Sequence, residues 1–328
     1  MVKIAVFFGG KISQHLVLLK KAAKRLGVNL DLVSYNKVTF DTNSGEVILR
    51  PNLQNETQVG KITETKKADD YDVIFFRTTG KHWEEVDLIL NSIKRDDVVV
   101  LDPLVRNGKP DMACKAWQML TLKKAGVDVP KTVYGSLWYL YEVMKKSKPF
   151  PNPSLDRAGD VMFEFPVILK GSGGDRGTRV FKADNLEELE KVVINLRRSE
   201  IDEGRRYMLQ EFIPNDGDYR VLVLGEKVLG VMKRSSQNKN EFRNNYSAGG
   251  SVEVADLPEN IKQLAVKAAK LCGLAVAGVD VAFRDFDIKK PVIWEVNKGP
   301  QFKGFMKATG IDVPAEIVKF LVSLKVNK

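Results

Sequence analysis

Two apolar runs in the last quarter of the chain each carry one acidic side chain. The first reads Gly278-Val-Asp280-Val, and the second, after a short interval, reads Val292-Ile-Trp-Glu295-Val-Asn297. Because side chains alternate between the two faces of a strand, Glu295 and Asn297 must point the same way. If the strand that holds Asp280 pairs beside them, three oxygen-bearing side chains meet on one face of a sheet.

Such a set of side chains is typical of a magnesium site. Mg²⁺ prefers hard oxygen ligands, takes few carboxylates from the protein and completes its shell with water and phosphate. The three residues alone do not exclude a second interpretation, in which Asp280 and Glu295 lie on the solvated face of an amphipathic strand.

A lysine that runs into a glycine-rich turn lies farther upstream. The segment reads Phe165-Pro-Val-Ile-Leu-Lys170-Gly-Ser-Gly-Gly-Asp-Arg-Gly177-Thr-Arg-Val-Phe181. Glycines let backbone amides approach an anion closely, and the lysine adds a point charge for phosphate oxygens. This is not a Walker A loop, because no Gly-Lys-Ser/Thr follows the glycines and a strand comes next. A plain hairpin turn beside a surface lysine would explain the same letters.

Taken in order, these segments resemble the ATP-grasp superfamily, and within it the RimK-type ATP-dependent carboxylate–amine (glutamate) ligases. The resemblance covers close to two-thirds of the chain, from about Asp111 to Val313. It implies a mixed α/β and α+β fold, with a parallel α/β (pre-ATP-grasp, Rossmann-like) domain followed by a two-lobed ATP-grasp module. The expected ranges are 1–110 for the N-terminal domain, 111–205 for a central lobe with the glycine-rich loop, and 206–328 for a C-terminal lobe with the Mg²⁺ site.

The resemblance also implies a nucleotide site. Lys115 and Lys170 match the family's two nucleotide-binding lysines, and Tyr207–Ile213 looks like the hinge strand that holds adenine. Asp218-Tyr-Arg220 resembles an Asp-x-Arg motif, in which the acid contacts the nucleotide and the arginine lies toward the substrate. The residues expected to bind the nucleotide are Lys115, Lys170, Gly173, Gly174, Gly177, Gln210, Glu211, Phe212, Ile213, Asp218, Lys233, Asn244 and Asn245.

Three arginines are expected to be catalytic: Arg220, Arg234 and Arg243, the last within a segment similar to the family's Phe-Arg-x-Asn. Guanidinium groups can offer bidentate bonds to carboxylate or to transferred phosphoryl oxygens. Arginines on strand surfaces, or a loop salt bridge for Arg243, are the simpler alternatives. The resemblance places Asp280, Glu295 and Asn297 on the metal ligands, and the implied cofactors are ATP and two Mg²⁺ ions, which Mn²⁺ could replace.

The chain departs from the family pattern at two places. After Asn297 the family usually reads x-x-Pro-Gly, whereas this chain has Lys298-Gly-Pro300-Gln301-Phe-Lys303-Gly, and Arg179 stands where a further glycine is common. Both changes would add basic side chains near phosphate or substrate. We therefore expect an acidic substrate, because the basic side chains near the site exceed what ATP needs: Arg176, Arg179, Arg220, Arg234, Arg243, Lys298 and Lys303.

Composition narrows the class of protein. The formal net charge of +10 suggests nucleic acid, but the lysines are scattered along most predicted helices, as solvated helix faces would be. Two cysteines argue against a disulfide framework, and no run approaches the roughly 20 apolar residues of a membrane span. We expect a cytoplasmic protein without a membrane or nucleic-acid partner, and a homo-oligomer is compatible with the sequence.

The predicted activity is that of an ATP-dependent ligase. It would join a glutamate-like amino acid to a peptide or small-molecule acceptor, acidic in character, through an acyl phosphate. One alternative is a small-molecule kinase built on the same fold, which would leave a stable phosphorylated product. The other is a basic RNA- or ribosome-binding module without catalysis, which would not need Glu295 or Asn297.

Hydrophobic periodicity predicts the secondary structure that frames these motifs. The first 110 residues alternate strand and helix, with a hairpin around Asn43-Ser-Gly45. A helix over Leu186–Leu196 is expected to begin at an Asp184 N-cap, with Glu187 completing a capping box. A later helix is expected to start near Pro258 and to stop at Gly273.

Overall fold

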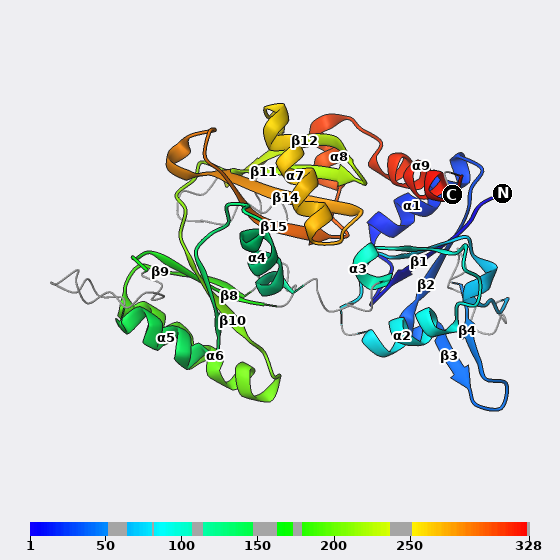
Figure 1. Cartoon of the computed structure of the whole chain (residues 1–328), viewed down its shortest axis with the longest axis horizontal. Coiled ribbons are helices and arrows are strands. Elements are labelled where there is room, and N and C mark those ends of the chain that lie inside the picture. The colour runs from blue at the N-terminus through cyan, green and yellow to red at the C-terminus, as the bar shows by residue number, and fades with distance from the viewer. Residues whose placement is uncertain are drawn as a thin grey trace.

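The structure is a computed structural model that describes residues 1–51, 64–80, 82–106, 114–146, 163–172, 179–236 and 251–326. Three bodies are visible in Figure 1: an N-terminal α/β domain, a central lobe and a C-terminal lobe. Each is built on a sheet of its own.

The N-terminal domain is a parallel sheet with the strand order β2-β1-β5-β6. Its four strands are apolar runs buried on both faces, as expected for a parallel sheet covered by helices. They are β1 (Lys3–Phe8), β2 (Asn29–Ser34), β5 (Val73–Phe76) and β6 (Val99–Leu101), and the helices are α1 (Gln14–Arg25), α2 (Trp83–Ser92) and α3 (Pro103–Arg106). The predicted hairpin forms from β3 (Val38–Asp41) and β4 (Glu46–Leu49). The predicted parallel domain is confirmed.

The central lobe contains an antiparallel sheet with the order β7-β10-β8-β9. Helices α5 and α6 pack against this sheet. Its strands are β7 (Thr132–Gly135), β8 (Val167–Gly171), β9 (Val180–Ala183) and β10 (Tyr207–Glu211), and its helices are α5 (Leu137–Lys146) and α6 (Leu186–Asp202). Apolar side chains of these two helices and of the sheet form one core.

The cap predicted for α6 is wrong by one residue. Asn185, not Asp184, occupies the N-cap, and its side chain accepts a hydrogen bond from the Glu188 backbone N–H. Glu188 accepts bonds from the Asp184 backbone N–H and from the Asn185 side-chain amide, so Asn185 and Glu188 make the contacts expected of Asp184 and Glu187. Asn and Asp cap equally well, which is why the sequence alone did not separate the two positions.

The C-terminal lobe is a five-stranded antiparallel sheet with the order β13-β12-β11-β14-β15. The strands are β11 (Asp218–Leu224), β12 (Lys227–Ser235), β13 (Ser251–Ala255), β14 (Val276–Phe283) and β15 (Pro291–Lys298). One face packs against α4 (Lys115–Lys124) and α7 (Glu259–Leu271). The other face packs against α8 (Lys303–Thr309) and the helix that follows it, α9 (Val313–Val326). As predicted, α7 follows Pro258 and ends before Gly273.

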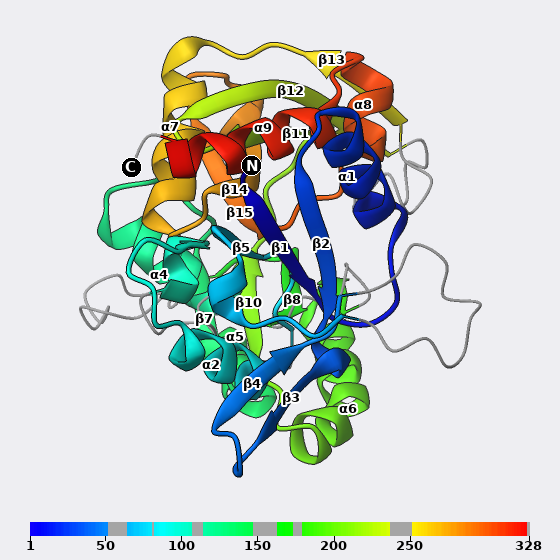
Figure 2. The same cartoon turned by 90° about the vertical axis from the view of Figure 1, so that its right-hand side faces the viewer.

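Two helices make contacts beyond the lobe to which their predicted range belongs. Helix α4 packs against β15 and α7 of the C-terminal lobe and also contacts β7 of the central lobe, and α9 packs against α1 of the N-terminal domain. Figure 2 shows α9 and α1 side by side near the N-terminus. The boundaries near residues 110 and 205 remain predictions.

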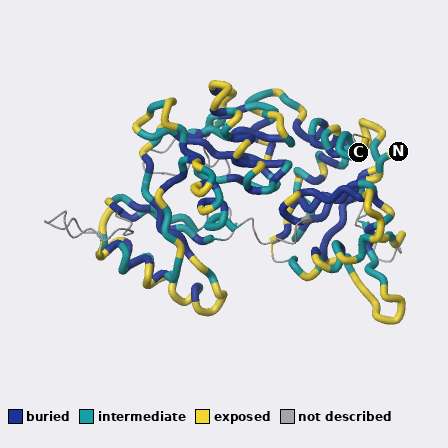
Figure 3. The backbone as a smooth tube through the Cα atoms, viewed as in Figure 1, coloured by how far each residue is buried: buried dark blue, intermediate teal, exposed yellow. Residues whose placement is uncertain are grey.

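One apolar cluster crosses between two of the bodies. It joins one face of the N-terminal sheet to the α8 and α9 side of the C-terminal lobe, through buried residues such as Leu19, Leu222, Phe302 and Phe305. In Figure 3 the buried strands form the interior of all three bodies, while exposed residues follow the outer sides of the helices and turns. Within the described parts of the chain, no helix combines the length and apolar character that crossing a membrane requires.

Candidate active site

The three predicted metal ligands lie on one face of the C-terminal sheet. Strands β14 and β15 pair antiparallel, with Asp280 opposite Glu295 and Gly278 opposite Asn297. The Asn297 side-chain amide donates to Asp280 Oδ2 at 3.1 Å. A register irregularity directly after Asp280 ends the polar stretch, and beyond it Val281 pairs with Ile293 in the core.

Two arginines from neighbouring strands neutralise Asp280. Arg220 on β11 donates through Nε and Nη2 to the two carboxylate oxygens, each at 2.8 Å. Arg234 on β12 lies 3.0 Å from Asp280 Oδ2 and also pairs with Asp218. Gly278 permits this arrangement, since a Cβ there would stand 3.4 Å from the Arg220 side chain and 2.9 Å from Pro300.

These charges keep the acids ionised. Burial alone would raise the pKa of Asp280, but the charges of Arg220 and Arg234 outweigh burial and lower that pKa to about 2. Burial opposes ionisation of Glu295 as well, and the charges of Lys115 and Lys170 lower its pKa below the ordinary value. Both carboxylates are therefore available as anionic ligands at neutral pH.

Two lysines approach the same acids from the other elements. Lys115 is the first residue of α4, and its Nζ lies 3.1 Å from Glu295 Oε1. The charge of Lys115 adds to the positive end of the α4 dipole, so an anion at this point would be stabilised by both. Lys170 lies near the end of β8 in the central lobe, where burial and then the charge of Lys115 lower its pKa to about 8.

The donor set fits Mg²⁺. No group of three or more His, Cys, Asp or Glu side chains that could hold a metal ion occurs among the residues that the structure describes. Two carboxylates and one amide are nevertheless what Mg²⁺ takes from a protein when phosphate and water supply the remaining ligands. The cations now paired with Asp280 and Glu295 show that this face attracts positive charge.

The predicted hinge residues lie at the end of β10, the last strand of the central lobe, and directly after it. Gln210 donates to Thr132 Oγ1 at 2.7 Å, and Glu211 accepts bonds from the Lys131 backbone N–H and from Arg284. Phe212 lies under Lys182, whose Nζ is 5.1 Å from the ring centroid, and Ile213 is buried. The side chain of Glu211 thus joins the segment before β7 to Arg284 of the C-terminal lobe. Adenine binding by this strand stays a prediction.

Two further predicted residues lie beside Arg234. Asp218 pairs directly across from it, is only 1% exposed, and has a pKa raised by burial. In this arrangement its carboxylate orients Arg234. Lys233 lies on the opposite face of β12, bonded to Asp216 at 2.8 Å and over the ring of Tyr219. Nucleotide contacts of Asp218 and Lys233 stay predictions.

Several predicted site residues lie outside the described part of the chain, and their roles stay predictions: Gly173, Gly174, Arg176, Gly177, Arg243, Asn244 and Asn245.

The prediction that Lys298 adds charge to the site is wrong. Strand alternation turns Lys298 to the face opposite Asn297, where its Nζ is 3.9 Å from Asp102. Lys303 bonds to Gln14, and Arg179 pairs with Glu203 at 3.4 Å. Of the predicted basic substrate-binding side chains that the structure describes, Arg220 and Arg234 are therefore the ones that lie at the site, and each is paired with an acid there.

One residue outside the predicted set supports β15, the strand of Glu295 and Asn297. Gln118, one turn after Lys115 on α4, is buried and donates to the Val296 backbone carbonyl at 2.8 Å, between Glu295 and Asn297. Its spacing of three residues from Lys115 places both side chains on one helix face, and that spacing was the available signal.

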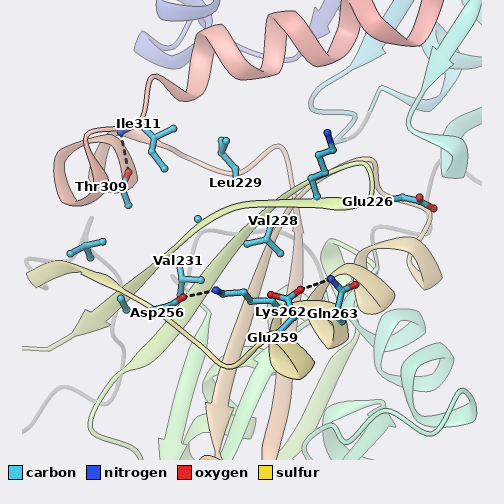
Figure 4. Close-up of a pocket in the computed structure, with 14 residues that line it drawn as sticks. Glu226, Val228, Leu229, Val231, Asp256, Glu259, Lys262, Gln263, Thr309 and Ile311 are labelled. Carbon is cyan, nitrogen blue, oxygen red and sulfur yellow. Dashed lines mark hydrogen bonds and ion pairs between the residues drawn. The ribbon is translucent and has the colours of Figure 1, made fainter. Parts of the chain in front are cut away.

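A separate hollow of about 560 Å³ lies beside the first residues of β12, and none of the candidate site residues lines it. Figure 4 shows Lys262 bonded to Asp256 and Gln263 bonded to Glu259 along its rim. These polar side chains at the rim thus bond to one another.

Comparison with known families identifies this architecture. The family model described as the RimK-like ATP-grasp domain matches residues 153–321, just over half of the chain. The chain belongs to this family. This match confirms the predicted RimK-like ATP-grasp fold and ligase class at the level of the family, and ATP-grasp ligases use ATP and Mg²⁺.

Relatives of this RimK-like protein carry the name "Probable alpha-L-glutamate ligase". The relative from Rhodopirellula baltica is 25% identical over 305 residues, which are 92% of this chain and 66% of the relative. The relative from Pasteurella multocida is 26% identical over 307 residues, which are 92% of this chain and 88% of the relative. The chain thus spans from two-thirds to nearly nine-tenths of the length of these two relatives.

Solved structures share the fold. The ATP-grasp ligase PsnB, complexed with a phosphomimetic variant of a minimal precursor, Mg and ADP, matches with a TM-score of 0.66 and 16% identity over 99% of both chains. A RimK domain ATP-grasp protein from Sphaerobacter thermophilus matches with a TM-score of 0.63 and 17% identity, over 97% of this chain and 99% of that one. At these identities the likeness concerns the fold alone.

Proposed function

We propose that this RimK-like ATP-grasp protein is an ATP-dependent carboxylate–amine ligase that works through an acyl phosphate. It adds a glutamate-like amino acid to a peptide or small-molecule acceptor. The observation that carries the proposal is the meeting of two ionised acids, Asp280 and Glu295, with cations from both lobes, Lys115, Lys170 and Arg220. The names of the glutamate-ligase relatives support the choice of amino acid.

The chemistry has two steps. An oxygen of the substrate carboxylate attacks the γ-phosphorus of ATP, the bond to the bridging oxygen breaks, and ADP leaves. The amine then attacks the acyl carbon, phosphate leaves with the bonding electrons, and the amine loses a proton. Mg²⁺ held by Asp280, Glu295 and Asn297 would neutralise charge that develops on the phosphates. We propose two ions, for which Mn²⁺ could substitute.

The residues of the chain have distinct tasks in this scheme. Lys115 and Lys170 hold phosphate oxygens from opposite lobes, so closing the lobes brings both charges to the same group. Arg220 and Arg234 present guanidinium groups whose geometry matches a carboxylate or a transferred phosphoryl group, as their bonds to Asp280 illustrate. Water must be excluded, because an acyl phosphate hydrolyses readily.

The products of ATP decide between this ligase and other reactions. With ATP, Mg²⁺ and a pool of amino acids, the protein should release ADP and phosphate, and mass spectrometry should find a condensation product. Hydroxylamine should trap the acyl phosphate as a hydroxamate. AMP and pyrophosphate would indicate adenylation instead, and a stable phosphorylated product would indicate a kinase. ATP-independent RNA binding with steep salt dependence would favour the non-catalytic alternative.

An acidic substrate is the finer part of the proposal. Arg220 and Arg234 stand together in a partly desolvated site, and guanidinium groups in such a place favour carboxylates. Arg220→Ala should raise the KM for the acidic substrate or lower kcat far more than it changes ATP affinity. Arg198→Ala, which removes an exposed arginine paired with Asp202, serves as the control. Better use of neutral or basic amino acids would refute the acidic substrate and leave the ligase intact.

A further inference from the structure

The segment that follows β15, the strand of Glu295 and Asn297, contacts the N-terminal domain directly. Lys298 follows Asn297, and its side chain is 6% exposed and 3.9 Å from a carboxylate of Asp102 that is 0% exposed. Asp102 follows β6, and its other oxygen accepts a bond from the Ala275 backbone N–H at 2.9 Å, next to the start of β14. One N-terminal carboxylate thus contacts both strands that carry metal ligands.

A second contact comes from Arg77, which follows β5 and is 4% exposed. Its Nη2 donates to the Pro300 carbonyl at 2.9 Å, and its guanidinium lies over the ring of Phe302, 5.4 Å from the centroid. The Arg77 carbonyl also lies so near Gly299 that a Cβ there would come within 2.5 Å of it. Gly299, with a φ of +61°, is therefore required on two grounds.

We infer that Arg77, Asp102 and Lys298 form an interdomain clamp that positions Glu295 and Asn297 for Mg²⁺, so that the N-terminal domain completes the metal site. The inference rests on the proposed magnesium site. None of the three residues touches the metal face, so each acts as a positioning residue. Residues that orient metal ligands from outside the coordination shell commonly change metal affinity or activity by about 10–100-fold.

Simple adhesion between the domains is the competing explanation. The apolar cluster around Phe302 and Phe305 already joins the domains. Buried ion pairs cost desolvation and can often be replaced by apolar side chains without loss of stability. Charged groups in such a place are therefore better explained by fixing a position than by adding stability.

A second interdomain lysine supplies the matched control. Lys325 on α9 lies 2.6 Å from Asp97 of the N-terminal domain and donates to the Asp97 carbonyl at 2.8 Å. It joins the same two bodies through α9 and Asp97, far from β14 and β15 in the sequence. Lys325→Met therefore removes an interdomain ion pair without touching the segment after Asn297.

The test uses the full chain with Lys298→Met, with the double variant Asp102→Asn/Lys298→Met, and with Lys325→Met. Titration calorimetry measures ADP binding at several Mg²⁺ concentrations, and hydrogen exchange measures protection of residues 292–302 without ligand. We expect the first two variants to need about 10–100-fold more Mg²⁺ and to exchange faster in 292–302. Lys325→Met should change the Mg²⁺ requirement by less than about twofold, a difference expected for an exposed pair.

The outcomes separate the clamp from the proposed function. If the wild type binds Mg²⁺ and ADP but all variants match Lys325→Met in affinity and exchange, the clamp is refuted. If the wild type shows no Mg²⁺-dependent binding, the proposed function fails, and exchange in 292–302 still decides whether the clamp holds the strand. Should Lys298→Met not fold, the double variant decides, because it removes both members of the pair and leaves neither buried without its partner.

Discussion

The central lobe and the C-terminal lobe are both antiparallel sheets covered by helices, yet their cores differ in extent. Among the residues that the structure describes, the buried members of the central core all lie between Leu137 and Leu209, within the lobe itself. The core beneath α8 and α9, in contrast, continues into the N-terminal sheet. The metal ligands thus stand on a platform made of two bodies, while Lys170 stands on a lobe with a separate core. A lobe of that kind can move as a unit against the platform.

The platform and the central lobe contribute different groups to the site. The platform holds the acids and, through α4, Lys115, so its geometry is fixed by packing with α7 and with the N-terminal domain. The central lobe brings Lys170 to that platform. Substitutions on the platform should therefore affect metal binding and chemistry, and those on the central lobe should affect nucleotide affinity.

The largest effect is expected for Glu295→Gln on the platform. The change removes the charge that pairs with Lys115 and leaves the size of the side chain unchanged. Turnover should fall by about 10³-fold or more, as when a group that stabilises developing charge is lost. Steady-state release of ADP measures the effect, with circular dichroism to verify the fold.

The control for this change is Glu226→Gln, the same substitution at an exposed glutamate that pairs with Lys270. Near-normal turnover in Glu295→Gln would show that the metal site lies elsewhere. A loss of folded protein in Glu295→Gln alone would mean that the acid is structural.

Much of the platform was predictable from local pattern. Alternation placed Glu295 and Asn297 on one face, and the apolar runs gave the strands of the N-terminal sheet. The pairing of Asp102 with Lys298 was not predictable, because the two residues are brought together by packing between domains. The sequence therefore suggested Lys298 as a site residue, although strand alternation from Asn297 already pointed it to the other face.

A smaller effect, confined to the central lobe, is expected from the protonation of Lys170. Burial lowers its pKa to about 8, and bound phosphate favours the charged ammonium. Nucleotide binding should therefore take up protons near pH 8.5, and affinity should fall as the pH rises above about 8. The fall approaches about tenfold per pH unit at most, the limit for one coupled proton.

Calorimetry of ADP and Mg²⁺ binding at pH 8.5, in two buffers of different ionisation enthalpy, gives the number of protons taken up. Lys170→Arg is the matched variant, because a guanidinium stays charged throughout this range. Equal proton uptake by the wild type and by Lys170→Arg would assign the titration to another group.

The smallest effect is expected at the joint between the lobes. Arg284, 28% exposed, bonds to Asp128 at 2.8 Å and to Glu211 at 2.7 Å, on the two chain segments through which the central lobe is attached. Arg284→Ala should loosen this joint and change the KM for ATP by about twofold to fivefold, since a partly exposed ion pair contributes about 0.2–1 kcal/mol. Lys290→Ala, which removes a neighbouring pair with Asp285, touches neither segment and should leave KM unchanged. Hydrogen exchange should quicken in residues 128–132 and 211–217 and not inside the central core, because that core does not depend on Arg284. Faster exchange throughout the central lobe would show that the lobe is not a separate unit, and the contrast with the platform would then be wrong.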